Sequence, residues 1–282
     1  MKGYDKMSHN NQKKIAVIND FSGFGRCSIA VSLPIISAMK IQCCPLITSV
    51  FSNHTGFEDY FFDDYTRNME EYASKWKKLD LRFKGICTGF LGSAKQISIV
   101  EKFVKDFRTE DTVVVVDPVM GDYGKAYATY TEQMCSKMKE MIDFADILTP
   151  NLTEACILTD TEYRHEGWSE ESVRELAIKL SGEGKRKVVI TGIYMEDYIG
   201  NYIYEQGKYE TMIKSHIVGE ERSGTGDIFS SIIVADAVNG VDFKESVEKA
   251  AAFICKCIAK SIEMNIPKTD GVCFEELLHE LI

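Results

Sequence analysis

The chain has 282 residues, of which 45% are hydrophobic and 27% are charged, and its net charge at neutral pH is −10. This composition is typical of a soluble protein with a sizeable core. The acidic balance excludes nucleic acid and anionic membranes as standing partners, because both require basic patches. A local site for an anionic nucleotide remains compatible with it, provided that Mg²⁺ and helix N-termini supply positive charge.

The first 14 residues are polar and lack the apolar segment of a signal peptide, and no apolar run approaches the ~20 residues that span a bilayer. The nine cysteines are scattered and form no Cys-x-x-Cys pair, so neither a zinc ribbon nor a thioredoxin-like site is indicated. We therefore expect a cytoplasmic protein with free thiols, a flexible tail over residues 1–14 and a single domain over residues 15–282.

Short, almost uniformly apolar runs alternate with helical stretches along the chain. Such runs are typical of parallel strands covered on both faces, and the alternation predicts βαβ units with right-handed crossovers. The predicted strands are 15–18, 44–50, 85–88, 113–116, 147–149 and 188–191. The predicted helices between them are 25–39, 93–107, 131–143 and 169–182.

The last third of the chain has a different pattern. Polar and apolar residues alternate over 198–213 around Gln206-Gly207, which predicts an antiparallel hairpin at the sheet edge. Helices over 226–238 and 244–264 then close the chain. The predicted fold class is a three-layer α/β/α architecture with helices on both faces of a central, mostly parallel sheet.

Polar or glycine-rich residues follow all six predicted strands. In strand order, they are Asn19-Asp20 with a turn over 22–25, His54-Thr55, Gly89-Phe90, Asp117-Pro118, Asn151 with Glu154, and Thr191-Gly192. Each has a plain structural interpretation: Asn151 and Glu154, for example, are typical of a helix start, and His54 of an ordinary loop residue. Because ligands of open parallel sheets bind beyond the carboxyl ends of the strands, their convergence nevertheless predicts one cleft.

The segment Ser223-Gly-Thr-Gly-Asp227 precedes a predicted helix. Its glycines allow close backbone approach, and the unpaired N–H groups of 224–227 would attract an anion. The same field should keep Asp227 ionised, and so able to accept a proton from a substrate alcohol. By itself the segment is equally compatible with a helix-capping acid, and neither the P-loop pattern nor GxGxxG is present.

Phosphoryl transfer requires the combination of groups that these segments offer. It needs a metal ion, anchors for nucleotide phosphates, stabilisation of the transferred group and a base. Mg²⁺ prefers oxygen ligands and keeps several waters, so Asp117 and Glu154 suffice as its protein ligands, directly or through water. Asn151 and Thr191 offer neutral hydrogen bonds to phosphate oxygens.

Five segments together resemble the ribokinase-like superfamily, and within it the vitamin B6 (pyridoxal/pyridoxamine) kinases. They are Phe51-Ser-Asn-His-Thr-Gly56, Gly89-Phe-Leu-Gly-Ser-Ala94, Asp117-Pro-Val-Met-Gly-Asp122, Thr149-Pro-Asn-Leu-Thr-Glu154 and Ser223-Gly-Thr-Gly-Asp227. They stand in family order over nearly the whole chain. The last segment marks only the superfamily, whereas the first and third are more specific for the B6 group.

The resemblance implies ATP-dependent phosphorylation of the 5′-hydroxymethyl group of pyridoxal, pyridoxine or pyridoxamine. It implies that Asp227 is the base, that Gly224, Thr225 and Gly226 form the anion hole, and that Asp117 and Glu154 are at the metal positions. The nucleotide positions correspond to Asn151, Glu154, Thr191 and Gly192, and the substrate positions to Asp20, Ser22, His54, Thr55, Phe90 and Tyr127. The resemblance further implies Mg²⁺ and a homodimer, and it leaves open a monovalent cation such as K⁺.

One position departs from the family pattern. B6 kinases commonly carry a serine that contacts the pyridine ring where this chain has Asp20. An acid there could pair with a pyridinium nitrogen or a substrate amine, which would favour pyridoxamine. The Ser- and Gly-rich composition of this stretch at Ser22-Gly23 is also similar to that of hydroxymethylpyrimidine kinases, so such a kinase is the first alternative. A non-catalytic protein that binds pyridoxal phosphate or nucleotide is the second.

Overall fold

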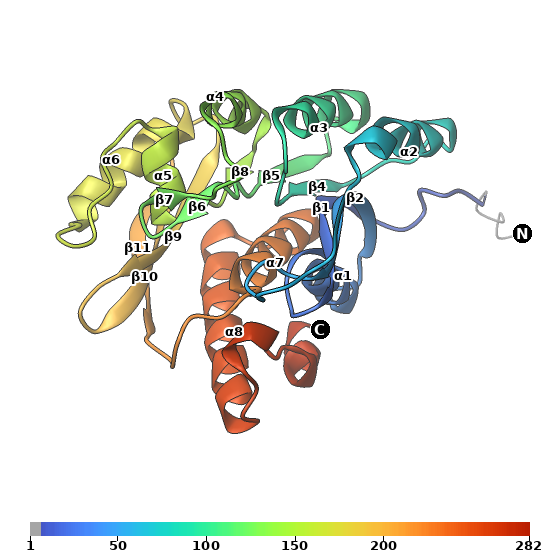
Figure 1. Ribbon diagram of the computed structural model, residues 1–282. Helices are drawn as coiled ribbons and strands as arrows, with labels where there is room; N and C mark the ends of the chain where they lie inside the picture. The colour runs from blue at the N-terminus through green and yellow to red at the C-terminus, as the bar shows by residue number, and fades with distance from the viewer. Residues whose placement is uncertain (1–6) are drawn as a thin grey trace, which may run out of the picture.

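The computed structural model describes residues 7–282, so part of the predicted tail, residues 1–6, lies outside the described residues. A nine-stranded sheet in the order β11-β10-β9-β8-β5-β4-β1-β2-β3 runs through the centre of the molecule (Figure 1). In chain order its strands are β1 (Lys14–Phe24), β2 (Gln42–Asn53), β3 (Phe62–Asp64), β4 (Gly85–Thr88), β5 (Val113–Val116), β8 (Ile147–Leu148), β9 (Lys187–Tyr194), β10 (Tyr198–Glu205) and β11 (Tyr209–His216). A separate small hairpin joins β6 (Gly121–Asp122) to β7 (Lys125–Ala126).

The sheet is mostly parallel, as the apolar runs predict. Strands β9, β8, β5, β4, β1 and β2 pair in parallel, whereas β3 at one edge and β10 and β11 at the other are antiparallel. The predicted hairpin around Gln206-Gly207 is therefore confirmed as β10–β11.

Helices cover both faces of the sheet (Figure 1). One face carries α2 (Thr66–Lys78), α3 (Ala94–Phe107), α4 (Glu132–Met141), α5 (Leu152–Leu158) and α6 (Glu170–Ser181). The other face carries α1 (Ser28–Ala38), α7 (Thr225–Asn239) and α8 (Phe243–Glu263). Short 3₁₀ turns complete the set: η1 (Ile142–Phe144), η2 (Lys268–Asp270) and η3 (Glu275–Leu281). The predicted three-layer α/β/α class is confirmed.

Each central strand contributes to two cores because successive side chains point to opposite faces. In β1, Ala16 and Ile18 are buried against α2–α6, while Ile15 and Val17 are buried against α1, α7 and α8. Both sets are at most 2% exposed. This two-sided burial explains why the strands read as uninterrupted apolar runs.

The structure differs from the sequence prediction at the end of the first strand. The predicted turn over Ser22–Gly25 is wrong, because β1 continues to Phe24 and pairs with β2 as far as Asn53. The pairing register shifts between Asn19 and Phe21, which marks a β-bulge. Ser and Gly residues suggest a turn locally, but the long partner strand β2 determines the outcome here. Helix α2 was not predicted, and for α5 only its start at Asn151 was.

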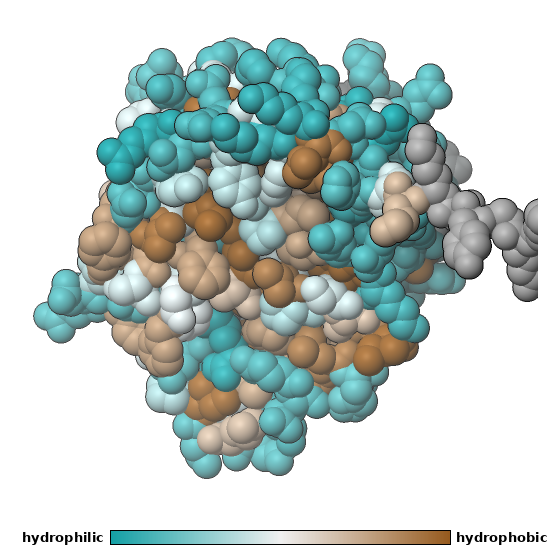
Figure 2. All heavy atoms as spheres, turned by 90° about the vertical axis from the view of Figure 1, so that its right-hand side faces the viewer, coloured by the Kyte–Doolittle hydropathy of each residue, from teal (hydrophilic) through white to brown (hydrophobic). Residues whose placement is uncertain are grey.

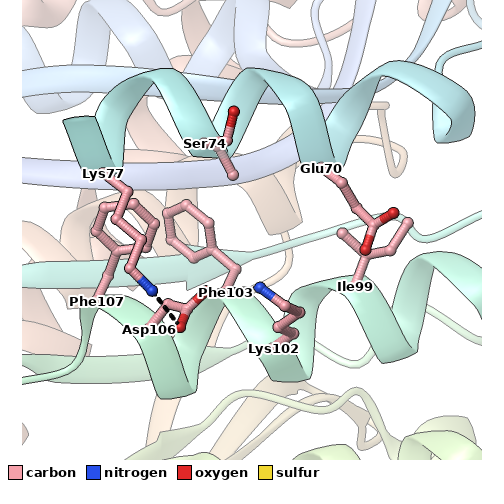
Figure 3. A pocket seen from close by; sticks show the side chains of 9 residues that line it. Glu70, Ser74, Lys77, Ile99, Lys102, Phe103, Asp106 and Phe107 are labelled. Carbon is pink, nitrogen blue, oxygen red and sulfur yellow. Dashed lines mark hydrogen bonds and ion pairs between the residues drawn. The ribbon is translucent and has the colours of Figure 1, made fainter. Parts of the chain in front are cut away.

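A shallow hollow of about 90 Å³ lies between α2 and α3 (Figure 3). Asp106 on α3 pairs with Lys77 of α2 and Lys102 of its own helix, each at 2.8 Å. Phe103 and Phe107 form its apolar base. The hollow is a groove between two outer helices that the Lys77–Asp106 ion pair bridges, and it is separate from the cleft described below. Among the described residues, no helix is both long enough and apolar enough to cross a membrane.

Phe83, which is 1% exposed, packs in an aromatic cluster with Trp76, Phe103 and Phe107. We expect Phe83→Ala to lower the free energy of unfolding by about 3–5 kcal/mol, because the truncated side chain leaves a cavity. Ile262→Ala, at a side chain 47% exposed on α8, should change it by less than about 0.5 kcal/mol. Urea unfolding measures both values, and equal losses would contradict the assignment of this cluster to the core.

Candidate active site

A cleft of about 760 Å³ opens along the carboxyl-end edge of the parallel strands. Most of the predicted site residues line it. They are His54, Phe90, Asp117, Tyr127, Asn151, Glu154, Thr191, Gly192, Gly224, Thr225, Gly226 and Asp227. Three predicted residues, Asp20, Ser22 and Thr55, do not belong to its lining.

Asp227 lies in the first turn of α7, and two N–H groups from elsewhere in the chain hold its carboxylate. The side-chain amide of Asn19 donates to Oδ1 at 3.1 Å, and the backbone N–H of Ser28 donates to Oδ2 at 2.7 Å. Asn19 lies in β1, and Ser28 is the first residue of α1. Each oxygen keeps a further lone pair, so the carboxylate is oriented and can still accept a proton.

The pKa of Asp227 is raised to about 6, mainly because burial disfavours its charged form. The N–H of Ser28 and the amide of Asn19 act in the opposite direction, and the charge of Asp20 adds to the rise. The helix field alone predicts a lowered pKa, so burial dominates here. Asp227 is still largely ionised at pH 7, and a pKa near the working pH suits a general base.

The turn before α7 presents bare backbone to the cleft. Gly224 has a φ of +90°, and a Cβ there would lie 2.3 Å from the carbonyl oxygen of Arg26. Only glycine fits this position. No side chain of the described residues caps α7, and no atom lies within 4 Å of where a Cβ on Gly226 would stand. The first-turn N–H groups are therefore accessible to an anion.

Asn19 connects three parts of the site, although the sequence gives it no special motif. Its Oδ1 accepts from the backbone N–H groups of Asp20 (2.9 Å) and Phe90 (2.8 Å), while its Nδ2 donates to Asp227. A Cβ on Gly89 would lie 2.4 Å from the Asn19 amide. Gly89 is thus needed to make room for Asn19. The only signal in the sequence was the place of Asn19 directly after an apolar run.

Asp117 and Glu154, the predicted metal ligands, are held close enough to influence each other's titration. Burial raises the pKa of Asp117 well above its ordinary value, and the charges of Glu154 and Asp227 raise it further. Burial also raises the pKa of Glu154 to about 8, against backbone N–H donors. Two crowded carboxylates of this kind are stabilised by a bound cation.

The helix-start interpretation of Asn151 and Glu154 is confirmed. Asn151 Oδ1 accepts from the N–H of Glu154 (2.9 Å), and Glu154 Oε2 accepts from the N–H of Asn151 (2.8 Å), which makes a capping box for α5. Glu154 Oε1 accepts from the N–H of Met120 at 3.0 Å. Both carboxylate oxygens are thus used, which favours contact with a metal ion through water. Asn151 also forms a β-bridge with Thr191, so these two nucleotide candidates are adjacent.

The expected substrate contact of Asp20 requires correction. Asp20 is 5% exposed and Ser22 is 1% exposed, and neither reaches the cleft. Asp20 accepts hydrogen bonds from the hydroxyls of Ser28 (2.6 Å) and Ser22 (3.3 Å). Ser28 lines the cleft instead. A pairing of Asp20 with a ring nitrogen or substrate amine, and the preference for pyridoxamine built on it, is therefore unsupported.

The two nitrogens of the His54 ring are both engaged. Nδ1 accepts from the N–H of Gly56 (3.0 Å), so Nε2 carries the proton and donates to the carbonyl of Thr269 (2.7 Å). His54 therefore ties the loop after β2 to η2. Thr55 is exposed on this loop, outside the lining, while Phe90 and Tyr127 line the cleft.

Residues outside the predicted set also line the cleft. Asp122, Tyr123, Tyr163, Tyr194, Glu221 and Arg222 all line it. The Tyr123 hydroxyl, at the tip of the β6–β7 hairpin, donates to Glu221 in the loop before α7. Because these segments are about 100 residues apart, only the fold brings them together.

A helix N-terminus without a cap, an oriented carboxylate beside it and a paired acidic site across the same cleft define a phosphotransferase that acts on an alcohol group. The fold is that of the ribokinase-like kinases. The model of the phosphomethylpyrimidine kinase family matches residues 29–271, and the chain belongs to this family.

Relatives of two substrate classes match the chain at similar identity. A pyridoxal kinase from Arabidopsis thaliana is 29% identical over 73% of the chain and 67% of its own length. A hydroxymethylpyrimidine/phosphomethylpyrimidine kinase from Aquifex aeolicus is 27% identical over 89% of the chain and 90% of its own length. A Bacteroides thetaiotaomicron protein provisionally classed as a phosphomethylpyrimidine kinase, crystallised with pyridoxal, is 37% identical with a TM-score of 0.91 and covers 96% of each chain.

The resemblance to B6 kinases of the ribokinase-like superfamily is thus confirmed, and the alternative of a non-catalytic binder gives way to an enzyme. The comparisons identify the family, and its members matched here include both pyridoxal kinases and hydroxymethylpyrimidine/phosphomethylpyrimidine kinases.

We expect Gly89→Ala to lower kcat by ~10²-fold, because the new methyl group displaces Asn19 and thereby the Asp227 carboxylate. The matched control is Gly92→Ala, where the new Cβ would meet its nearest neighbour at 3.6 Å, an ordinary contact. Steady-state kinetics with the best substrate measures both. Wild-type kcat in Gly89→Ala would show that Asn19 does not position the base.

Proposed function

We propose that the enzyme is an ATP-dependent kinase of vitamin B6, which phosphorylates the 5′-hydroxymethyl group of a pyridoxal-type vitamer. The observation that carries the proposal is the Asp227 carboxylate, held by Asn19 and Ser28 beside the uncapped start of α7. The 37% identical protein crystallised with pyridoxal supports the choice of substrate class.

The reaction follows from this geometry. Asp227 accepts the proton of the substrate hydroxyl as the oxygen attacks the γ-phosphorus of ATP, and ADP leaves with the electrons of the broken P–O bond. The N–H groups at Gly224–Gly226 then stabilise the charge on the transferred phosphoryl group. Asn151, Thr191 and Gly192 hold the nucleotide, and Phe90, Tyr127 and the loop carrying His54 and Thr55 enclose the substrate ring.

Asp117 and Glu154 fit a Mg²⁺ ion, which would neutralise charge on the ATP phosphates. Among the described residues, no group of three or more His, Cys, Asp or Glu side chains is arranged to hold a metal by itself. Mg²⁺ needs only one or two carboxylates, with water and phosphate as its other ligands. The two crowded, buried carboxylates support this assignment. A monovalent cation such as K⁺ stays a prediction.

Hydroxymethylpyrimidine is the second candidate substrate, and the matching family model favours it. Both candidates are flat nitrogen heterocycles with a primary hydroxymethyl group, so the same base and anion hole serve either. The buried position of Asp20 removes the one residue that the sequence offered to distinguish them.

The first test is a substrate panel. Purified protein with Mg-ATP should release ADP with pyridoxal, pyridoxine or pyridoxamine, because each presents the 5′-hydroxyl to Asp227. Coupled ADP detection, with hydroxymethylpyrimidine in the same panel, measures turnover. Turnover of the pyrimidine alone would transfer the proposal to the second candidate, and no turnover with any compound would refute both.

Replacing the base tests the mechanism. Asp227→Asn should lower kcat by ~10²–10⁴-fold while the Kd for ATP is maintained, because only proton acceptance is lost. Asp236→Asn is the matched control on the same helix, since Asp236 is buried and paired with Lys249 at 2.5 Å, away from the cleft lining. It should affect stability and leave kcat unchanged. Nearly intact turnover in Asp227→Asn would show that Asp227 only occupies the start of the helix and is not the base.

The homodimer expected from the resemblance is part of the proposal. Figure 2, which views the molecule from the β2 side of Figure 1, shows apolar side chains across the middle of this face. Aromatic residues of β1, β3 and the loop between β2 and β3 are exposed: Phe21, Phe24, Tyr60, Phe61 and Phe62. We expect light scattering to give about twice 31.8 kDa, and Phe61→Asp to shift the mass toward the monomer. A monomeric wild type at all concentrations would contradict the dimer.

A further inference from the structure

We propose that Asp20 is a positioning residue that acts on the base Asp227 through Ser28, and that its negative charge sets the pH at which the base becomes active. This inference rests on the proposed function of Asp227. It assigns Asp20 to the proton-transfer machinery, in place of the substrate contact that the sequence suggested.

Ser28 bridges the two carboxylates. Its backbone N–H donates to Asp227 Oδ2 at 2.7 Å, and its hydroxyl donates to Asp20 Oδ1 at 2.6 Å. The short hydrogen bond from the Ser28 hydroxyl stabilises the ionised form of Asp20, whereas burial raises the pKa of Asp20 above its ordinary value. Ser28 therefore donates one hydrogen bond to the base Asp227 and another to the buried carboxylate of Asp20.

The backbone at Ser28 indicates that this arrangement is imposed on the chain. Ser28 begins α1 with a φ of +55°, in the left-handed region that non-glycine residues rarely adopt. Such a conformation persists only where surrounding contacts determine it. The hydrogen bonds to Asp20 and Asp227, together with the one from Ser32 to the Ser28 carbonyl (3.1 Å), are the contacts that hold it.

Asp20 is itself fixed on its other sides. Its N–H donates to Asn19 Oδ1, and the Ser22 hydroxyl donates to Oδ2 at 3.3 Å. Asn19 in turn donates to Asp227. Two consecutive residues of β1 thus act on the base, Asn19 by direct contact and Asp20 through Ser28.

Several titratable groups face Asp227 besides Asp20. They come from the start of α1, from β4, from the loop after β5 and from the loop after β7, and they are Cys27, Cys87, Asp117 and Tyr127. Arg26 is turned away into a salt bridge with Glu275 at 2.7 Å. Asp20 differs from the other groups because Ser28 joins it to the base by two short hydrogen bonds. Its charge disfavours the ionised base, so neutralising Asp20 should favour ionisation of Asp227 at lower pH.

The decisive variant is Asp20→Asn, which retains an acceptor for the Ser28 hydroxyl and removes the charge. The titration midpoint of Asp227, followed by carboxyl ¹³C NMR and assigned with Asp227→Asn, should move to lower pH. The acid limb of kcat/KM for pyridoxal should move in the same direction, with the KM for ATP unchanged. Asp236→Asn is the matched control, because it removes a buried carboxylate away from the cleft lining and should leave both readouts in place.

An unmoved Asp227 midpoint and an unmoved acid limb in Asp20→Asn would overturn the proposal. A large rise in the KM for pyridoxal without a shift in either readout would place Asp20 at the substrate instead. Should no variant turn over any substrate, the proposed function fails, while the NMR midpoint still decides the coupling.

If Asp20→Asn does not fold, Asp20→Ser removes the same charge with a smaller side chain and is read out in the same two ways. An unmoved Asp227 midpoint together with an unmoved acid limb in Asp20→Ser would overturn the proposal.

Discussion

The two hydrogen bonds that hold the Asp227 carboxylate are the interaction on which the rest of the site depends. Asn19 donates to one oxygen and the backbone N–H of Ser28 donates to the other, so both donors must themselves be held in place. Gly89 leaves room for the Asn19 amide, because a Cβ at Gly89 would lie 2.4 Å from it. Ser28 adopts a left-handed backbone conformation in which it contacts the carboxylates of both Asp20 and Asp227. Beside these residues the pairing register of β1 and β2 shifts, with the extra residue on β2, so Asn19 and Asp20 lie at an irregular point of the sheet.

Acidic side chains outnumber basic ones in the lining of the cleft. Six carboxylates line the cleft of this enzyme of net charge −10, those of Asp117, Asp122, Glu154, Glu220, Glu221 and Asp227. Burial raises the pKa values of Asp117, Asp122, Glu154, Glu221 and Asp227, and nearby acidic groups raise those of Asp117, Glu154, Glu221 and Asp227 further. Positive charge in the lining comes from the N–H groups at the start of α7 and from Arg222 and Lys268, so an anionic nucleotide would be attracted to these places and to a cation held by Asp117. Local positive groups would thus allow an anion to bind although the net charge of the protein is negative.

The fold was largely predictable from the sequence, because two-sided burial leaves apolar runs that local patterns reveal. The lining of the cleft was predictable where a polar residue lies at or just beyond the end of an apolar run, as Asp117, Asn151 and Thr191 do. Two kinds of feature escaped. The course of β1 past Asn19 depends on pairing with β2, which is a tertiary interaction that Ser and Gly residues do not indicate. The contact of Tyr123 with Glu221 joins segments far apart in the chain, so no local pattern contains it. Asp20 shows both problems: its alignment suggested a substrate contact, whereas the fold places the start of α1 against it, where the Ser28 hydroxyl donates to its carboxylate.

The capping and catalytic interpretations of Asp227 do not exclude each other. A carboxylate in the first turn of a helix is stabilised by the helix field, which lowers its pKa, and a base with a very low pKa is a poor proton acceptor. Burial and the charge of Asp20 act against the helix field and bring the pKa of Asp227 to about 6. Asn19 and Ser28 then fix its direction without neutralising it. In the proposed reaction the helix start holds the phosphate, while burial and the charge of Asp20 keep the pKa of Asp227 high enough for it to accept a proton.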